Sequence, residues 1–105
     1  MESEGSIMND QERARVTELE AKYDAFKPKL DQLRQSLEAF KESYQDYIEL
    51  REFYGSQEWF DLREKPHHDL KSGILSEDQL YDFVVNHGDL LADFLDLSAE
   101  MYRHI

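Results

Sequence analysis

The sequence predicts an all-α protein, an elongated antiparallel helical hairpin with a short connecting helix. Apolar residues recur at alternating spacings of three and four along two long segments, and a stretch containing glycine, serine and proline separates these segments. Because Pro28 lies inside the first segment, a three-helix bundle broken at Pro28 is the alternative. A chain of 105 residues forms one domain at most. We therefore expect a flexible extension over residues 1–8 and a single helical domain over residues 9–105.

The first helix is expected over about residues 10–53. Its apolar stripe keeps strict 3-4 alternation over four to five heptads, the signature of a coiled coil or a long bundle helix. The stripe consists of Val16, Leu19, Tyr23, Phe26, Leu30, Leu33, Leu37, Phe40, Tyr44 and Tyr47, with Tyr54 one heptad on. Because the stripe keeps its phase across Pro28, we expect one continuous helix that is kinked near residues 24–28.

The connection has its own start and stop signals. Gly55 follows the last apolar turn and predicts a left-handed stop. Ser56 predicts the cap of a short helix over residues 57–64, which places Trp59 against the end of the hairpin. A loop is expected over residues 65–68.

The last helix is expected from Ser76 to about residue 103, continuing through Gly88. Ser76 and Gln79 predict a capping box, and Leu75 and Leu80 predict the hydrophobic staple that accompanies it. Just before this helix, Gly73 is expected to need a positive φ. The apolar face comprises Leu80, Phe83, Val84, Leu91, Phe94, Leu97 and Met101.

The two helices differ in length. At 1.5 Å per residue the first spans roughly 65 Å and the last roughly 42 Å. The N-terminal part of the first helix therefore has no partner in a hairpin, and exposed stripes of this kind usually find another chain. We expect self-association into a homodimer through Val16, Leu19, Tyr23 and Phe26.

Composition narrows the classes of partner. The chain has 24 Asp and Glu against 12 Lys and Arg, a net charge of −12, which disfavours direct binding to nucleic acid or to an anionic membrane. It has no cysteine, and no apolar run reaches the roughly 18 residues of a membrane span. We expect a cytoplasmic protein that uses no cofactor.

The last helix carries an acidic stripe. At 100° per residue its members fall on one narrow side, opposite the apolar face, and no Lys or Arg occurs between Lys71 and Arg103. The simplest interpretation is a solvated surface. The alternative is a decoy that imitates a phosphate backbone for a basic nucleic-acid-binding protein. The stripe consists of Asp78, Asp82, Asp89, Asp93, Asp96 and Glu100.

Other chemistry-bearing residues give weaker signals. His67, His68 and Asp69 invite a metal interpretation, but no second His pair stands at ligand spacing, so no metal site is expected. A thin helical hairpin offers little concavity, so no catalytic residues are expected either. Trp59 is most simply a plug at the hairpin end, and its alternative role is an interface anchor.

Two short segments resemble a known family. The segment from Phe53 to Trp59 (Phe-Tyr-Gly-Ser-x-x-Trp) and the segment from Leu70 to Asp82, which contains Gly-Ile-Leu-Ser-Glu-Asp, are similar to the bacterial domain-of-unknown-function family 4298. The resemblance covers about residues 12–102 and departs at residues 64–68, where the family's acidic loop is longer. It implies a helical hairpin in a bacterial cytoplasm, and it supplies no catalytic residues.

Together these observations predict a small, acidic, non-enzymatic helical module for protein–protein interaction. Self-association is expected through the N-terminal overhang. A protein partner, favoured to be basic by the charge of the chain, is expected at the acidic stripe or near Trp59.

Overall fold

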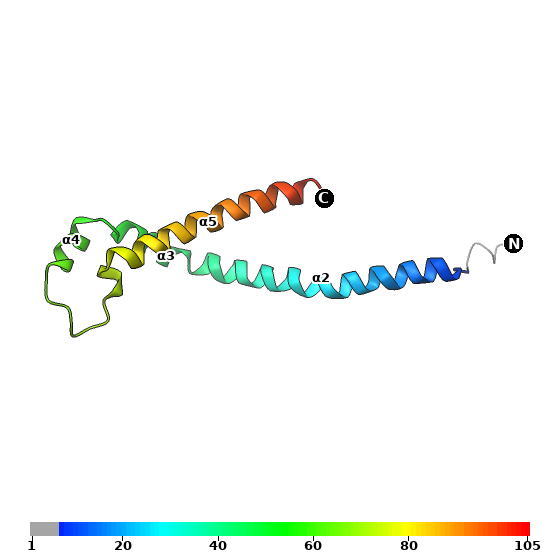
Figure 1. Ribbon diagram of the computed structural model, residues 1–105, viewed down its shortest axis with the longest axis horizontal. Helices are drawn as coiled ribbons and strands as arrows, with labels where there is room; N and C mark the ends of the chain where they lie inside the picture. Colours follow the sequence, from blue (N-terminus) through cyan, green and yellow to red (C-terminus); the bar gives the residue numbers. More distant parts are fainter. Residues whose placement is uncertain (1–6) are drawn as a thin grey trace. The chain divides into compact units, whose positions relative to one another are not determined.

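The computed structural model describes residues 7–105, and within this range it is helical and has no strand (Figure 1). The chain divides into two compact units, one ending at Ser43 and one spanning Tyr44–Ile105, and each is described by itself. The all-α prediction is confirmed. The expected flexible extension over residues 1–8 falls largely outside the described residues, and the single domain over residues 9–105 stays a prediction.

The first unit is a single long helix, α2 (Asp10–Glu42). A capping box begins it: the Asn9 side chain accepts a hydrogen bond from the Glu12 N–H (2.8 Å), and the Asn9 N–H donates to the Glu12 carboxylate (3.0 Å). The Asn-x-x-Glu spacing of this box is visible in the sequence, although the apolar period, which begins only at Val16, does not point to it.

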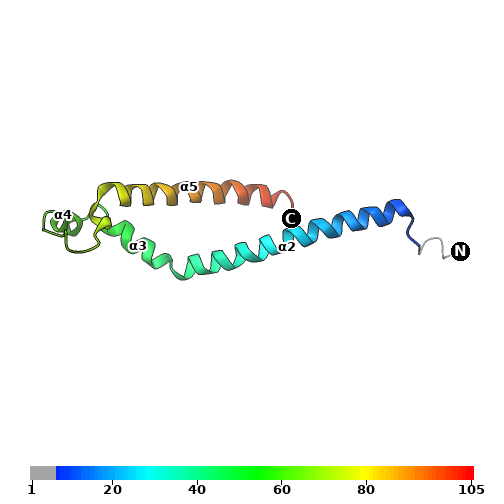
Figure 2. The same cartoon turned by 60° about the horizontal axis from the view of Figure 1, so that its bottom comes forward.

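Figure 2 draws α2 as one unbroken helix, and Pro28 lies inside it. Pro28 lies on the side of α2 opposite the apolar stripe, so the backbone carbonyl that loses its intrahelical donor, that of Asp24, faces solvent and can bind water. The alternative fold, a bundle broken at Pro28, is therefore wrong.

The prediction of one continuous helix over about residues 10–53 is wrong, although the helical segment does end at Phe53. Helix α2 ends at Glu42, and α3 (Tyr44–Phe53) begins after Ser43, whose φ of −100° and ψ of 5° depart from helical values. Serine favours such breaks because its hydroxyl offers the backbone local hydrogen bonds that compete with the helix. The 3-4 stripe passes through Ser43 without a change of phase, so periodicity alone could not locate the break.

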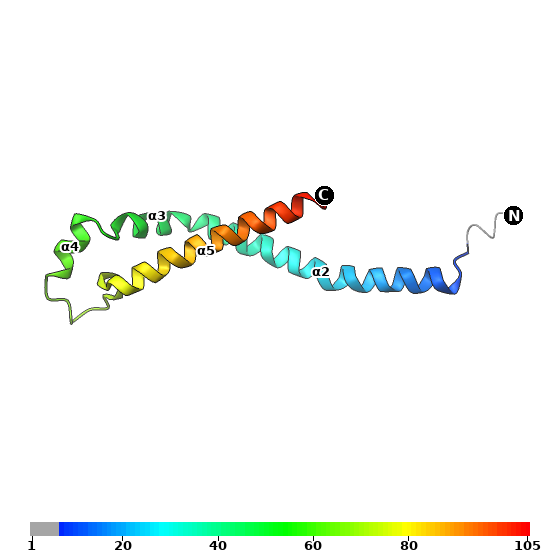
Figure 3. The same ribbon diagram turned by 45° about the horizontal axis from the view of Figure 1, so that its top comes forward.

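The second unit contains the hairpin. Helix α3 and helix α5 (Glu77–Tyr102) run side by side in opposite directions, and α4 (Gln57–Arg63) lies at the turn between them (Figure 3). The hairpin and its short connecting helix are confirmed. A loop and one turn of 3-10 helix, η1 (Gly73–Leu75), join α4 to α5.

The turn after α3 follows the sequence signals. Gly55 has a φ of 79°, the left-handed conformation that terminates a helix at low cost only when the residue is glycine. The Ser56 hydroxyl then accepts a hydrogen bond from the Trp59 N–H (3.1 Å) and caps α4.

The start of α5 is predicted correctly, but its cap differs in detail. The Ser76 hydroxyl accepts from the Gln79 N–H (3.4 Å), while the Ser76 N–H donates to the Gly73 carbonyl (2.9 Å) inside η1 and so has no need of the Gln79 side chain. Only half of the predicted capping box forms. Gly73 lacks the positive φ we expected, and the Gln79 side-chain amide instead occupies the space that a Cβ at Gly73 would need.

The core of the second unit is small. Among residues 7–105, only Trp59 and Leu80 are buried, with 3% and 2% of their surface exposed. Helix α5 continues through Gly88 to Tyr102, as predicted. Of the other apolar side chains of α5, those of Phe83 and Val84 are half-buried and the rest are exposed, so most of the apolar face faces solvent.

Candidate interaction surfaces

Trp59 closes the end of the hairpin. Its indole N–H donates a hydrogen bond to the Ile74 carbonyl (3.0 Å), which ties α4 to η1. Tyr54 meets the indole edge-on at 5.0 Å between ring centroids, and the Arg63 guanidinium lies 4.4 Å from the ring centroid. This arrangement supports the interpretation of Trp59 as a plug. The apolar surface that faces solvent here belongs to its neighbour Phe60, which is 47% exposed.

An open groove of about 820 Å³ lies beside this plug. Its apolar part comes from Leu50, Phe53, Leu62 and Ile74, and its acidic part from Asp46, Glu49, Glu52 and Glu58. The groove is open, and its four acidic residues are exposed to solvent.

An aromatic cluster joins α3 to α5. The Tyr47 ring stacks on the His87 imidazole with 3.9 Å between centroids and 9° between planes, and it meets Phe83 at 5.3 Å. The Tyr44 hydroxyl is hydrogen-bonded to Nε2 of His87 (2.7 Å). This role of His87 was not predicted, because the residue stands next to Gly88 in a stretch that resembles an interruption. The signal that could have found it is its spacing of four from Phe83 and seven from Leu80, which places it on the apolar face.

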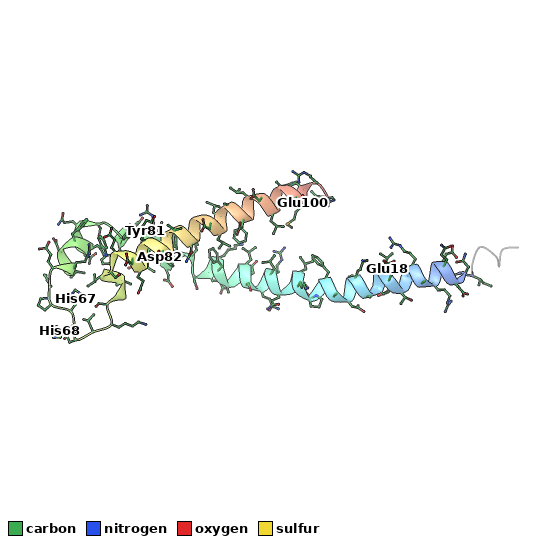
Figure 4. The ribbon with its side chains drawn as sticks, viewed as in Figure 1. Glu18, His67, His68, Tyr81, Asp82 and Glu100 are labelled. Atoms are coloured by element: carbon green, nitrogen blue, oxygen red, sulfur yellow. The ribbon has the colours of Figure 1, made fainter. Side chains whose placement is uncertain are left out.

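The acidic stripe is exposed along its whole length, from Asp78 to Glu100. Figure 4 labels Asp82 near the start of α5 and Glu100 near its end. The Glu100 carboxylate pairs with Arg103 (2.6 Å) and His104 (3.0 Å). Within residues 7–105, the other five carboxylates of the stripe make no ion pair, so they remain available to a cationic partner.

The apolar stripe of α2 is the most exposed apolar feature of the first unit, and α2 has no buried residue. We call seven of its residues the α2 seam; each has between 36% and 63% of its surface exposed. An open depression of about 380 Å³ on this helix is lined by Val16, Leu19, Glu20 and Tyr23, which include three of the four predicted association residues. The α2 seam consists of Val16, Leu19, Tyr23, Phe26, Leu30, Leu33 and Leu37.

The histidine pair lies in the loop between α4 and η1, where Figure 4 labels it. Nδ1 of His67 is 2.7 Å from the Lys65 carbonyl oxygen, which can only accept, so this nitrogen carries the proton. Among residues 7–105, no group of three or more His, Cys, Asp and Glu side chains is placed to hold a metal ion. Within the same range, no helix combines the length and the apolar character that crossing a membrane requires.

Comparison with known proteins identifies a family. A search of the curated proteins finds no match. Residues 16–97, which include most of α2, the aromatic cluster, the Trp59 plug and most of α5, match the family model described as a domain of unknown function, DUF4298. The chain is therefore a member of the DUF4298 family.

Proposed function

We propose that this protein is a non-enzymatic protein–protein interaction module that self-associates through the N-terminal part of the α2 seam, in the cytoplasm of a bacterium. The residues proposed to make the contact are Val16, Leu19, Tyr23 and Phe26. A protein interface needs exposed apolar side chains on a continuous surface, whereas an active site needs a water-excluding cavity. Among the described residues, continuous exposed apolar surface is far more evident than a water-excluding cavity.

The observation that carries this proposal is the exposure of a long, strictly periodic seam. Helix α2 has 33 residues, none of them buried, yet in proteins most helical stability comes from packing of an amphipathic face. The seam extends over 22 residues from Val16 to Leu37, or about 32 Å, a length comparable to that of a dimeric coiled-coil segment. A second chain that covers the seam supplies the missing packing.

Sedimentation equilibrium tests the proposal. The wild type is expected to be a dimer at micromolar concentration, and Leu19→Asp with Tyr23→Asp is expected to be monomeric because two carboxylates would have to enter an apolar contact. The matched control is Thr17→Asp with Ala21→Asp, which adds the same charge at the same spacing on the opposite side of α2. A monomeric wild type, or equal weakening by both double variants, would count against the proposal.

The exposed acidic stripe supports a second candidate function, that of a decoy for a nucleic-acid-binding protein. Five of its carboxylates are unpaired among the described residues and lie along one side of α5. A decoy must lose affinity for its target steeply as salt rises and must be displaced by DNA or RNA. Changing Asp89, Asp93 and Asp96 to Lys should abolish such binding without loss of helicity. Binding that is flat between low and high salt would falsify the decoy.

A further inference from the structure

The charged residues of α2 are sorted about its seam. All seven Lys and Arg residues of α2 occupy the two rows that flank the apolar stripe. Six of them are sequence neighbours of a stripe residue, as Lys22 is of Tyr23 and Lys27 is of Phe26. Of the eight carboxylates of α2, only Glu20 lies in a flanking row. The seven basic residues are Arg13, Arg15, Lys22, Lys27, Lys29, Arg34 and Lys41.

The seam is thus edged by positive charge although the chain carries a net charge of −12. Some of this charge is shared with the outer face, since Lys27 pairs with Asp31 at 2.7 Å and Arg15 with Glu18 at 3.0 Å. These pairs have both partners about half exposed or more, and such surface pairs contribute little and leave the cations free to meet a partner.

Two copies of α2 fit each other poorly. In a parallel coiled coil the flanking rows of the two helices face each other, which sets Lys22 against Lys27 and Lys29 against Arg34. In an antiparallel pair each row faces its own copy, and both rows are predominantly basic. Flanking charges decide which helices pair, so the α2 seam favours a helix that brings carboxylates to its edge.

A flat anionic membrane also fits poorly. A strict 3.5-residue repeat drifts by about 20° per heptad around a straight helix, so the seam turns by about 60° between Val16 and Leu37. A flat surface cannot follow this drift, whereas a second helix follows it by supercoiling.

Helix α5 has the complementary chemistry. It contains seven carboxylates and no Lys or Arg. It has 26 residues against ten in α3, and the ring contacts between these two helices end at His87. Beyond His87 the apolar side chains Leu90, Phe94, Leu97 and Met101 are exposed. At 100° per residue, Asp89, Asp93 and Glu100 fall along one edge of the ridge formed by Leu90, Leu97 and Met101.

We infer that self-association pairs the α2 seam of one copy with this acid-edged ridge of α5 in a second copy, and not α2 with α2. The inference rests on the proposed self-association and specifies which helix the second copy contributes. In such a dimer the α2 seam of each copy packs on the α5 ridge of the other. The two contacts are equivalent, and together they close the assembly. Basic residues at the edge of the seam then meet Asp89, Asp93 and Glu100 at the edge of the ridge, and the apolar residues of both helices leave water.

Charge exchange between two variants tests the pairing. The first variant reverses the seam edge by Lys22→Glu, Lys27→Glu and Lys29→Glu, and the second reverses the edge of the α5 ridge by Asp89→Lys, Asp93→Lys and Glu100→Lys. Each alone is expected to dimerise at least about tenfold more weakly than the wild type, because like charges then face each other in both contacts. Their equimolar mixture is expected to form a heterodimer of near wild-type strength, since both of its contacts join opposite charges.

The other pairings give different results in the same sedimentation experiment. If α2 pairs with α2, a mixture of the seam-edge variant and the wild type forms a tighter dimer than the wild type alone, and the α5 variant dimerises as strongly as the wild type. Either result overturns the inference and leaves the proposed self-association intact. Binding of the wild type to anionic phosphatidylserine vesicles without dimerisation, or a monomeric wild type, overturns both.

Discussion

Gly55 and Gly88 show how one residue type has opposite effects at two positions. A Cβ built at either position meets no atom within 4 Å, so steric space does not distinguish them. Gly55 has a φ of 79°, a conformation that costs an L-residue roughly 1 kcal/mol or more. Gly88 lies in the interior of α5, where glycine is about 1 kcal/mol less favourable than alanine.

We therefore predict opposite signs for two alanine substitutions. Gly55→Ala should lower the free energy of unfolding by about 1 kcal/mol, and Gly88→Ala should raise it by a similar amount. Urea denaturation followed by circular dichroism measures both, and each variant serves as the control for the other. Loss of stability in both would show that α5 does not continue through Gly88 in solution.

Trp59 is the residue on which the hairpin end most depends. Replacing it by Phe keeps an aromatic side chain but leaves the Ile74 carbonyl without its indole donor, which should lower the free energy of unfolding by about 1 kcal/mol. Phe60→Leu, at a half-exposed neighbour, should cost much less and is the control in the same urea denaturation. Equal stability of Trp59→Phe and the wild type would mean that the bond to Ile74 contributes nothing.

At the scale of the elements, the aromatic cluster holds α3 to α5. Tyr47 stacks on His87, and the same imidazole is hydrogen-bonded to Tyr44. A double-mutant cycle with Tyr47→Ala, His87→Ala and both together should give a coupling energy of about 0.5–1.5 kcal/mol, the range for a ring pair beyond area burial. Additive losses would mean that the stacked geometry is not maintained in solution.

The starts of the elements were predictable because capping is local chemistry. Ser56 and Ser76 each cap the residue three positions on, and Gly55 ends the helix just before it, so their roles could be predicted from sequence. The break at Ser43 could not, because serine is tolerated within helices and the apolar period does not change there. The Ser76 N–H donates to the Gly73 carbonyl and not to the Gln79 side chain. The apolar period does not indicate which of these two acceptors lies within reach.

The sequence predicted which residues form the candidate surfaces, but not the contacts that these residues make with distant parts of the chain. The α2 seam and the acidic stripe lie where their periodicities placed them, and both are exposed. The bond from Trp59 to Ile74 and the stacking of His87 on Tyr47 needed coordinates, since both join segments that are distant in sequence. The basic residues beside the seam are visible in the sequence. They point to a partner helix only because α2 buries none of its residues, which leaves the seam open to another chain.

At the scale of the whole molecule, the proposed association requires that α2 receive its packing from another chain. A lone amphipathic helix opens readily and exchanges its amide hydrogens fast, whereas a helix in a coiled coil exchanges them slowly. Protection of α2 should therefore depend on protein concentration. The early part of α5, whose Leu80 is buried and whose Phe83 and His87 contact Tyr47 of α3, provides an internal reference in the same sample.

Hydrogen exchange of residues 16–37 as a function of protein concentration tests the central claim most directly. We predict slow exchange in this segment at concentrations well above the dimer dissociation constant and fast exchange on dilution below it, while the exchange rate of residues 80–87, which are packed within one chain, changes much less. Leu19→Asp with Tyr23→Asp should show the fast rate at every concentration. Protection of residues 16–37 that does not change with concentration, or fast exchange at all concentrations, would contradict association through the α2 seam.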